Sequence, residues 1–467
     1  MSSPPSPSPL TVPVATMRAF VEAGTTRPLA WRLEQLQRLA RLLESAEPQM
    51  LAALASDLGR PEMEGSLELG ALRQELRHTR RHLAGWMRPR RHPLPLWAWP
   101  GQGAVHSEPL GCVLIIGAWN YPFELCLHPL LHALAAGNTA VVKPSELSPA
   151  SAALLAELLG RHFEPTVVQV VGGDGAVAAG LLERERFDHI LYTGGERVGR
   201  LVMAAAARHL TPVTLELGGR NPAIVLADAD PTITARRLLW GRCLNAGQTC
   251  LAPNHVLVAD GVRQALVAAF REQVRALYGQ DPLASPDLGR LVGAARFERL
   301  QGLLARAEAR GQVLLGGRWD EAGLRIEPTV VAVDDPDDDP LLQEELFAPI
   351  LPLLTVGGLE EALRLVRRQP TPLALYLFGG GAAERERVLA GSGSGSLVVN
   401  DTVIQGAMAH LPFGGIGPSG MGAYHGEAGF LTFSHRRSVI SRSLRPDPPI
   451  RFPPYAGKLG LVRRLMG

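Results

Sequence analysis

The chain has 467 residues, of which 46% are hydrophobic, so it is long enough to bury more than one core and we expect two or three domains. Its 47 Lys and Arg nearly balance its 45 Asp and Glu, and the formal charge of +2 argues against a nucleic-acid-binding surface and favours a small-molecule partner. Four cysteines without paired spacing indicate reduced thiols and a cytoplasmic location, and no metal site is predicted.

The composition and residue pattern of the N-terminal part of the chain change twice. Residues 1–17 are rich in Ser and Pro and lack the basic and apolar regions of a secretory signal, so we interpret them as a disordered lead-in. Residues 28–88 carry Leu at three- and four-residue intervals with Arg and Glu between, a pattern that predicts helices. The Pro- and Trp-rich segment that follows, up to residue 110, predicts an exposed arm or hairpin.

From Gly111 onward, short apolar runs such as GCVLIIGAW, TAVVKPS and DHILYTGG alternate with helical stretches, and a second set begins near Pro222. Such runs are typical of parallel strands covered by helices on both faces, so the sequence predicts two α/β domains. The sequence contains no run of about 18 apolar residues, so no transmembrane helix is predicted. Residues 458–466 mix cationic and apolar side chains at helical spacing, and we favour a tail helix that packs on its own protein, with peripheral membrane contact as the alternative.

Three residues are candidates for catalysis. Cys250 follows a small, polar, Gly-containing segment in NAGQTC, which suits a nucleophile that a carbonyl group must approach closely; the alternative is a buried structural thiol. Glu216 ends an apolar strand in TLELGG, where a raised pKa would suit a general base, although a surface carboxylate is an equal alternative. Asn120 follows another strand in WNYP, and its amide either donates to an oxyanion or simply forms a turn.

Other polar and glycine residues follow predicted strands and suggest a nucleotide. Lys143 and Glu146, in KPSE, either bind the hydroxyls of an adenosine ribose or form a surface ion pair. Gly194 and Gly199, in YTGGERVG, precede a helix whose N-terminus can face a phosphate, although their order differs from the dinucleotide fingerprint. Each signal is weak by itself.

Taken together, the motifs resemble the aldehyde dehydrogenase superfamily, from about residue 18 to residue 455. The order WNYP, KPSE, YTGG, ELGG, GQTC, ELFAP and PFGG along this chain matches the order in that family. The sequences AAAARHLTPVTLELGGRNP, FGGIGPSGMGAYHG and RFPPY resemble its class 3 branch. That branch oxidises medium- and long-chain aliphatic and aromatic aldehydes, is typically dimeric, and uses NAD and in many members NADP.

The resemblance implies an α/β fold with a Rossmann-like cofactor domain, an α/β catalytic domain and a small β oligomerisation arm. The expected parts are an NAD(P)-binding domain (18–89 and 111–216), a catalytic domain (217–426), an oligomerisation arm (90–110 and 427–446) and a C-terminal tail (447–467). We therefore expect a homodimer joined through the arm, whose exposed strand edge would gain a partner.

The resemblance also implies roles for single residues. Cys250 would be the nucleophile, Glu216 the general base, and Asn120 the oxyanion donor beside the Cys250 backbone N–H. Six further residues would contact the cofactor: Lys143 and Glu146 the adenosine ribose, Gly194 and Gly199 the pyrophosphate, Glu345 and Phe347 the nicotinamide ribose and ring.

Four positions depart from the family pattern: Ala118 before WNYP, Gly195 in YTGG, Arg220 after ELGG, and Ala348 after ELF. Gly195 lacks a hydroxyl that a phosphate could accept from, which leaves NAD and NADP both open as cofactors. Three alternatives to an aldehyde dehydrogenase that releases a free acid remain at this point: an acylating relative that passes its acyl group to a thiol, a non-catalytic relative, and a cysteine hydrolase without a redox role.

Overall fold

The structure is a computed structural model that describes residues 13–447 and 449–466. Residues 1–12 of the expected lead-in lie outside this range. The interpretation as a disordered lead-in is wrong for residues 14–17, because they begin helix α1 (Val14–Glu22). Val14 and Met17 lie one helical turn apart and are buried against the first sheet, which explains why this short segment is ordered.

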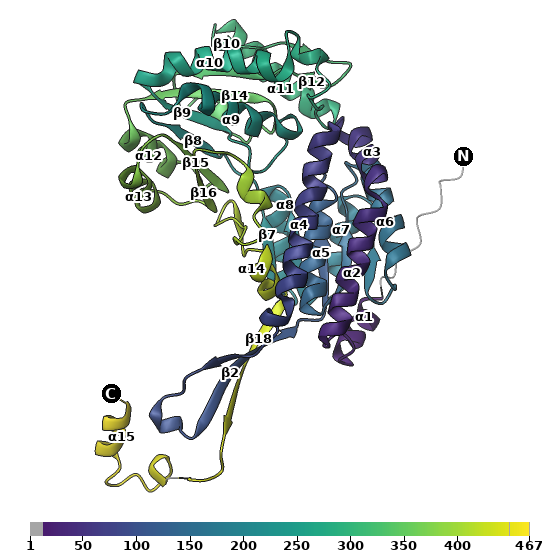
Figure 1. Ribbon diagram of the computed structural model, residues 1–467, viewed down its shortest axis with the longest axis vertical. Helices are drawn as coiled ribbons and strands as arrows, with labels where there is room; N and C mark the ends of the chain where they lie inside the picture. The colour runs from purple at the N-terminus through teal and green to yellow at the C-terminus, as the bar shows by residue number, and fades with distance from the viewer. Residues whose placement is uncertain (1–12, 448, 467) are drawn as a thin grey trace.

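Three long helices follow and cover one face of the first sheet (Figure 1). Their leucines form one continuous core with the next helices along the chain, because each helix has an apolar stripe. The three helices are α2 (Leu29–Ser45), α3 (Glu47–Leu58) and α4 (Glu62–Trp86), and the next two along the chain are α5 (Glu124–Ala136) and α6 (Pro149–His162). Helix α4 lies against α5, and both reach the central cleft described below.

The first sheet has six strands in the order β17-β7-β6-β3-β4-β5. All are parallel to their neighbours except β17, which runs antiparallel to β7. The strands are β3 (Cys112–Ile116), β4 (Thr139–Lys143), β5 (Val168–Val170), β6 (His189–Thr193), β7 (Val213–Glu216) and β17 (Gly420–Met421), and helices α7 (Gly175–Arg184) and α8 (Glu196–Ala207) connect three of them. The chain runs outward from β3 and then returns to its other side as β6, so a ligand crevice is expected at their carboxyl ends.

The second sheet has seven strands in the order β10-β13-β14-β9-β8-β15-β16. Only β10 is antiparallel to its neighbour. The strands are β8 (Pro222–Val225), β9 (His255–Ala259), β10 (Val313–Leu315), β13 (Thr329–Val333), β14 (Ile350–Val356), β15 (Ala374–Phe378) and β16 (Ser396–Val399). Its helices are α9 (Pro231–Cys243), α10 (Asp260–Tyr278), α11 (Ala294–Ala309), α12 (Leu359–Arg368) and α13 (Ala382–Gly391).

A three-stranded antiparallel arm, β1-β2-β18, projects from the body of the molecule (Figure 1). It contains β1 (Arg90–His92), β2 (Gly101–Pro109) and β18 (Ser434–Arg442), and β2 pairs with β18 along the full length of both. Helix α14 (Gly426–Thr432) precedes β18 and packs on α4 and α5. The tail ends in helix α15 (Leu459–Met466), which contacts the 3-10 turn at Leu96–Ala98 near the tip of the arm.

Candidate active site

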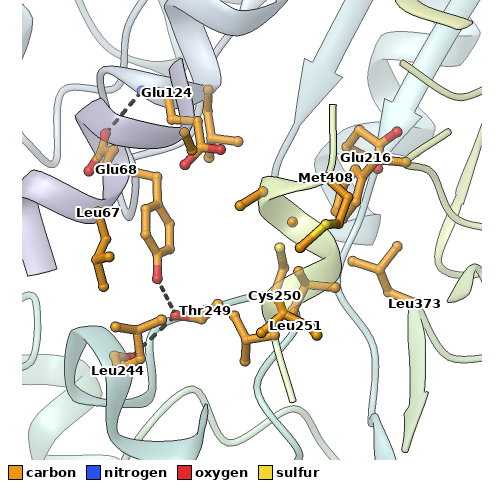
Figure 2. A pocket seen from close by; sticks show the side chains of 18 of the residues that line it. Leu67, Glu68, Glu124, Glu216, Leu244, Thr249, Cys250, Leu251, Leu373 and Met408 are labelled. Atoms are coloured by element: carbon orange, nitrogen blue, oxygen red, sulfur yellow. Dashed lines mark hydrogen bonds between the residues drawn. The ribbon is translucent and has the colours of Figure 1, made fainter. Parts of the chain in front are cut away.

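Two cavities meet between the two sheets. The first, of about 290 Å³, is lined mainly by apolar side chains, which include Leu67, Leu125, Trp240, Leu251, Ile404 and Met408. The second, of about 130 Å³, lies at the carboxyl ends of β3 and β6 and is lined by polar and glycine residues as well as aromatic ones. Cys250 and Glu216 line both cavities, so the structure brings these two candidates to one junction (Figure 2).

The loop that carries Cys250 has an unusual backbone. Asn245, Ala246 and Gly247 all have positive φ angles, of 53°, 53° and 76°, which is unfavourable for the two non-glycine residues. The Asn245 side chain offsets this cost: its amide donates to the carbonyls of Asn120 (2.8 Å) and Gln248 (3.2 Å). A side chain at Gly247 would collide with the backbone of Ala348, so only glycine fits there.

Asn221 fixes the other side of Cys250. This fully buried amide donates to the carbonyls of Cys250 (2.7 Å) and Ala252 (3.1 Å) and accepts from the N–H of Ala374 (2.8 Å). The nucleophile candidate is therefore held between strand β15 and the left-handed turn, while its thiol stays partly exposed at the junction of the cavities.

Glu216 is the last residue of β7, and its backbone carbonyl accepts from the N–H of Gly194 (3.0 Å). Its side chain is only 3% exposed, and within the described residues neither carboxylate oxygen has a hydrogen-bond partner. Burial therefore raises the pKa of Glu216 well above its ordinary value. Burial, followed by the charges of Glu345 and Glu216, also raises the pKa of the Cys250 thiol.

Asn120 follows β3 and lines the second cavity. One N–H of its amide donates to the Gln248 carbonyl (2.9 Å), which leaves the second N–H for a ligand. The turn is fixed by a buried ion pair that the sequence did not suggest: Arg60 binds both the Asn120 carbonyl and the Glu68 carboxylate. Glu68 in turn accepts from the N–H of Phe123 (3.0 Å), and burial raises its pKa to about 7.

The second cavity also contains Gly194, Glu345 and Phe347. A side chain at Gly218 would collide with the Glu345 carboxylate, so the ELGG turn allows the close approach of this group. Burial raises the pKa of Glu345 to about 7. Arg296, which the sequence analysis did not single out, lies over the Phe347 ring at 5.3 Å from its centroid.

Lys143, Glu146 and Gly199 do not line the two cavities. Lys143 ends β4 with a side chain 3% exposed, and its ammonium donates to Glu146 (2.9 Å), which is 42% exposed. The prediction that Gly199 precedes the helix is wrong, because Gly199 lies inside α8, where an added methyl group would press on Leu217. Because Gly199 has no side chain, α8 can lie close to the ELGG turn.

The chain matches the aldehyde dehydrogenase family over residues 14–439. It belongs to this family. It is 42% identical over 456 residues to aldehyde dehydrogenase family 3 member H1 of Arabidopsis thaliana, covering 97% of this chain and 94% of the relative. It is 40% identical over 449 residues to a Rattus norvegicus relative named aldehyde dehydrogenase, dimeric NADP-preferring, covering 96% and 98%.

A solved structure of Staphylococcus aureus AldH, in a substrate-bound state, matches this aldehyde dehydrogenase with a TM-score of 0.94 and 38% identity, covering 97% of this chain and 98% of that chain. The predicted α/β fold and the resemblance to family 3 members are therefore confirmed. The protein is an NAD(P)-dependent aldehyde dehydrogenase, and the prediction of NAD or NADP as its cofactor is confirmed at the level of the family.

Beside the second cavity of this aldehyde dehydrogenase, the start of helix α8 suits one phosphate of such a dinucleotide. Helix α8 begins after Gly194 and Gly195, and a methyl group added at Gly195 would meet no atom within 4 Å. Open space therefore lies over a helix N-terminus, which favours a phosphate there. Arg220, another departure from the family pattern, is engaged elsewhere, because its guanidinium donates to the Leu342 carbonyl (2.6 Å).

Two other departures are accommodated by local packing. Ala118 lines the second cavity, and Ala348 is buried beside Gly247.

Among the described residues, no helix combines the length and the apolar character needed to cross a membrane.

Proposed function

We propose that this aldehyde dehydrogenase oxidises medium- and long-chain aliphatic or aromatic aldehydes to carboxylic acids, through a thioester on Cys250. The observation that carries the proposal is the position of Cys250 and Glu216 at the junction of an apolar and a polar cavity. An apolar aldehyde in the first cavity would present its carbonyl carbon to the thiol. Short hydrophilic aldehydes would leave most of the apolar wall exposed to water, so they should be poorer substrates.

In the first step, Cys250 loses its proton to solvent and its sulfur adds to the aldehyde carbon. The carbonyl oxygen becomes an alkoxide, which the free N–H of the Asn120 amide and the Cys250 backbone N–H would stabilise, by about a hundredfold in rate or more per donor. Bound NAD(P) would supply a hydride acceptor for the former aldehyde carbon, and loss of the hydride would leave a thioester on Cys250.

In the second step, Glu216 takes a proton from a water molecule whose oxygen attacks the thioester carbon. The carbon–sulfur bond then breaks, the proton passes to the Cys250 sulfur, and the carboxylic acid leaves. The raised pKa of Glu216 supports this role, because a base whose pKa lies nearer to neutral binds a proton more readily than an exposed carboxylate.

For the cofactor, we propose contacts that follow its length across the carboxyl ends of the strands. Lys143 and Glu146 would hold the adenosine ribose, Gly194 and Gly199 would form the wall beside the pyrophosphate, and Glu345 and Phe347 would position the nicotinamide ribose and ring. The exposed Glu146 carboxylate would repel the extra phosphate of NADP, whereas Lys143 would attract it. We therefore propose NAD as the main cofactor and NADP as an accepted one.

An assay of aldehydes from two to sixteen carbons, together with benzaldehyde, tests this proposal with NAD and with NADP. We expect kcat/KM to rise with chain length and benzaldehyde to be oxidised. A preference for two- or three-carbon aldehydes would refute the substrate assignment. Addition of coenzyme A tests the acylating alternative: a thioester product in place of the free acid would refute hydrolysis by Glu216.

We further propose a cytoplasmic homodimer joined through the arm. Strand β18 has one unpaired edge within the described sheet and a mostly exposed surface, on which Ile440 is 69% exposed. Pairing of this edge with a second chain would cover it.

Helix α15, with exposed Leu459 and Leu461 beside Arg463 and Arg464, is the segment that would meet an anionic membrane surface. Sedimentation analysis would test the homodimer, and vesicle flotation with and without residues 453–467 would test the membrane contact.

A further inference from the structure

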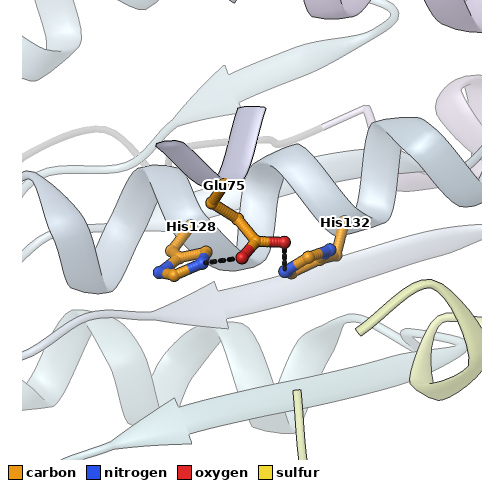
Figure 3. Close-up of side chains that lie close together, drawn as sticks. All are labelled: Glu75, His128 and His132. Atoms are coloured by element: carbon orange, nitrogen blue, oxygen red, sulfur yellow. Dashed lines mark ion pairs between the residues drawn. The ribbon is translucent and has the colours of Figure 1, made fainter. Parts of the chain in front are cut away.

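Three side chains of metal-binding type lie close together behind the wall of the apolar cavity. Glu75 comes from α4, and His128 and His132 come from α5, four residues apart and hence on one face of that helix (Figure 3). All three are buried, with exposed fractions of 1%, 2% and 0%. One ligand atom from each residue lies within 4.8 Å of the other two.

These three side chains do not satisfy one another by ordinary hydrogen bonds. Within the described residues, both ring nitrogens of His128 and of His132, and Glu75 Oε2, have no hydrogen-bond partner. His128 Nε2 lies 3.5 Å from Glu75 Oε2, and His132 Nε2 lies 3.5 Å from Glu75 Oε1. Hydrogen bonds of this type are about 2.7–3.2 Å long, so the groups face one another across gaps. Unpaired polar atoms are costly to bury, which calls for a shared partner.

The spacing between the ligand atoms of these three side chains suits a metal ion. Zinc binds imidazole nitrogen and carboxylate oxygen at about 2.0–2.2 Å in a tetrahedral arrangement, which separates neighbouring ligand atoms by roughly 3.4 Å. The two distances of 3.5 Å join different oxygens of Glu75 to the two rings, so an ion at this position would lie between the rings and face both carboxylate oxygens. Two histidines and one glutamate are also a common set of zinc ligands that leaves the fourth position open.

Neighbouring groups orient two of these side chains, as they do in known metal sites. Glu124 Oε1 lies 3.7 Å from His128 Nδ1, on the ring side that faces away from Glu75. A carboxylate there orients a ligating imidazole and increases its basicity. The Glu75 carboxylate is itself held, because Oε1 accepts from the N–H of Gly426 (2.8 Å) and from Thr79 Oγ1 (3.3 Å).

The charges of the cluster also favour a cation. The Glu75 carboxylate faces both His128 and His132, and the Glu124 carboxylate faces His128. These two carboxylates would stabilise a divalent cation between the rings.

We propose that Glu75, His128 and His132 form a buried binding site for one zinc-type divalent metal ion, separate from the catalytic junction. The ion would join α4 to α5, the two helices that supply Leu67 and Leu125 to the apolar cavity. His425, which lines that cavity, stacks on His128 with ring centroids 4.2 Å apart. The site would therefore stabilise the cavity wall without contacting the substrate.

Cobalt(II) titration of the full chain tests this proposal. The protein carries Cys250→Ala, which removes the partly exposed thiol that would otherwise compete for metal, and it is first treated with a chelator. We expect one Co²⁺ per chain, with visible d–d absorption typical of a tetrahedral site and without the thiolate charge-transfer band of a cysteine ligand. Zn²⁺ should bleach this absorption, and mass spectrometry of the native protein should show one added metal ion.

Two variants in the same background localise the site. His132→Ala and the nearly isosteric Glu75→Gln should each lower Co²⁺ affinity at least tenfold, so the test stands even if one of them folds poorly. His255→Ala is the matched control, because His255 is also a buried histidine but lies in the seven-stranded sheet, and it should bind as the parent does. Absence of stoichiometric binding in the parent, a thiolate band, or unchanged affinity in both variants would overturn the proposal; a protonated His128 between Glu75 and Glu124 would then explain the cluster.

Discussion

Replacement of Glu216 by Gln separates the two chemical steps. The side chains have nearly the same shape, and the carboxylate of Glu216 has no hydrogen-bond partner among the described residues that the amide would lose. Gln cannot take a proton from water, so hydrolysis of the thioester should slow while its formation on Cys250 continues. We expect a burst of reduced cofactor of about one equivalent per active site, followed by slow turnover.

The size of the effect follows from the role of a base. General base catalysis contributes about 10²–10⁴ in rate, so steady-state turnover of Glu216→Gln should fall by that factor. This corresponds to about 3–5 kcal/mol of transition-state stabilisation. Stability should not fall in parallel. The raised pKa means that unfolding lets Glu216 ionise, so its contribution opposes folding once the pH exceeds the ordinary carboxyl range. The variant should therefore be at least as stable as the wild type at neutral pH.

Stopped-flow fluorescence of the reduced cofactor measures both phases in one experiment. Glu327→Gln is the matched control, because Glu327 is also a buried carboxylate but lines neither cavity, and it should keep normal turnover. In the wild type, deacylation should weaken as the pH falls through the raised pKa of Glu216, and this dependence should vanish in Glu216→Gln. Loss of the burst itself would refute the reasoning, because it would move Glu216 to the first step.

Four shorter predictions concern the same junction. Cys250→Ala should abolish both dehydrogenase and esterase turnover, and retained dehydrogenase activity would contradict the assignment. Asn120→Ala should lower kcat by about 10²–10³, with KM nearly unchanged, if its amide stabilises the alkoxide. Asn221→Ala removes three buried hydrogen bonds and should cost about 3 kcal/mol or more in the free energy of unfolding, measured with denaturant; a loss below about 1 kcal/mol would contradict its structural role. Alkylation of Cys250 by iodoacetamide should have its pH midpoint at lower pH in Glu216→Gln, because the ionised carboxylate no longer disfavours the thiolate; an unchanged or higher midpoint would contradict this coupling.

Much of the fold followed from local patterns. Apolar runs such as GCVLIIGAW and DHILYTGG form the predicted parallel strands β3 and β6, because strands covered by helices on both faces require side chains without charge. The same logic places Asn120 and Glu216 at strand ends, where they face the second cavity. Position relative to a strand was therefore enough to nominate these residues, although each also had an ordinary structural interpretation.

Contacts between distant segments could not be predicted in this way. Arg60 reaches the Asn120 carbonyl across 60 positions of the chain, and no local pattern marks it as a partner. Arg296 meets Phe347 only because the start of α11 and the loop before β14 converge on the cavity. The left-handed backbone at Asn245 and Ala246 is imposed by surrounding hydrogen bonds against the preference of Ala. The helix at Val14 escaped prediction because the Ser and Pro before it dominated the composition of that segment.

The electrostatics of the junction link the two proposed steps. Burial raises the pKa of Glu216, and the Glu216 charge adds to the burial that raises the pKa of the Cys250 thiol. The pair therefore resists carrying two negative charges at once. Formation of the thioester removes the sulfur charge, because the acylated sulfur cannot ionise. The carboxylate of Glu216 is then easier to form at the stage in which a base is needed, so acylation of Cys250 itself prepares the base for hydrolysis.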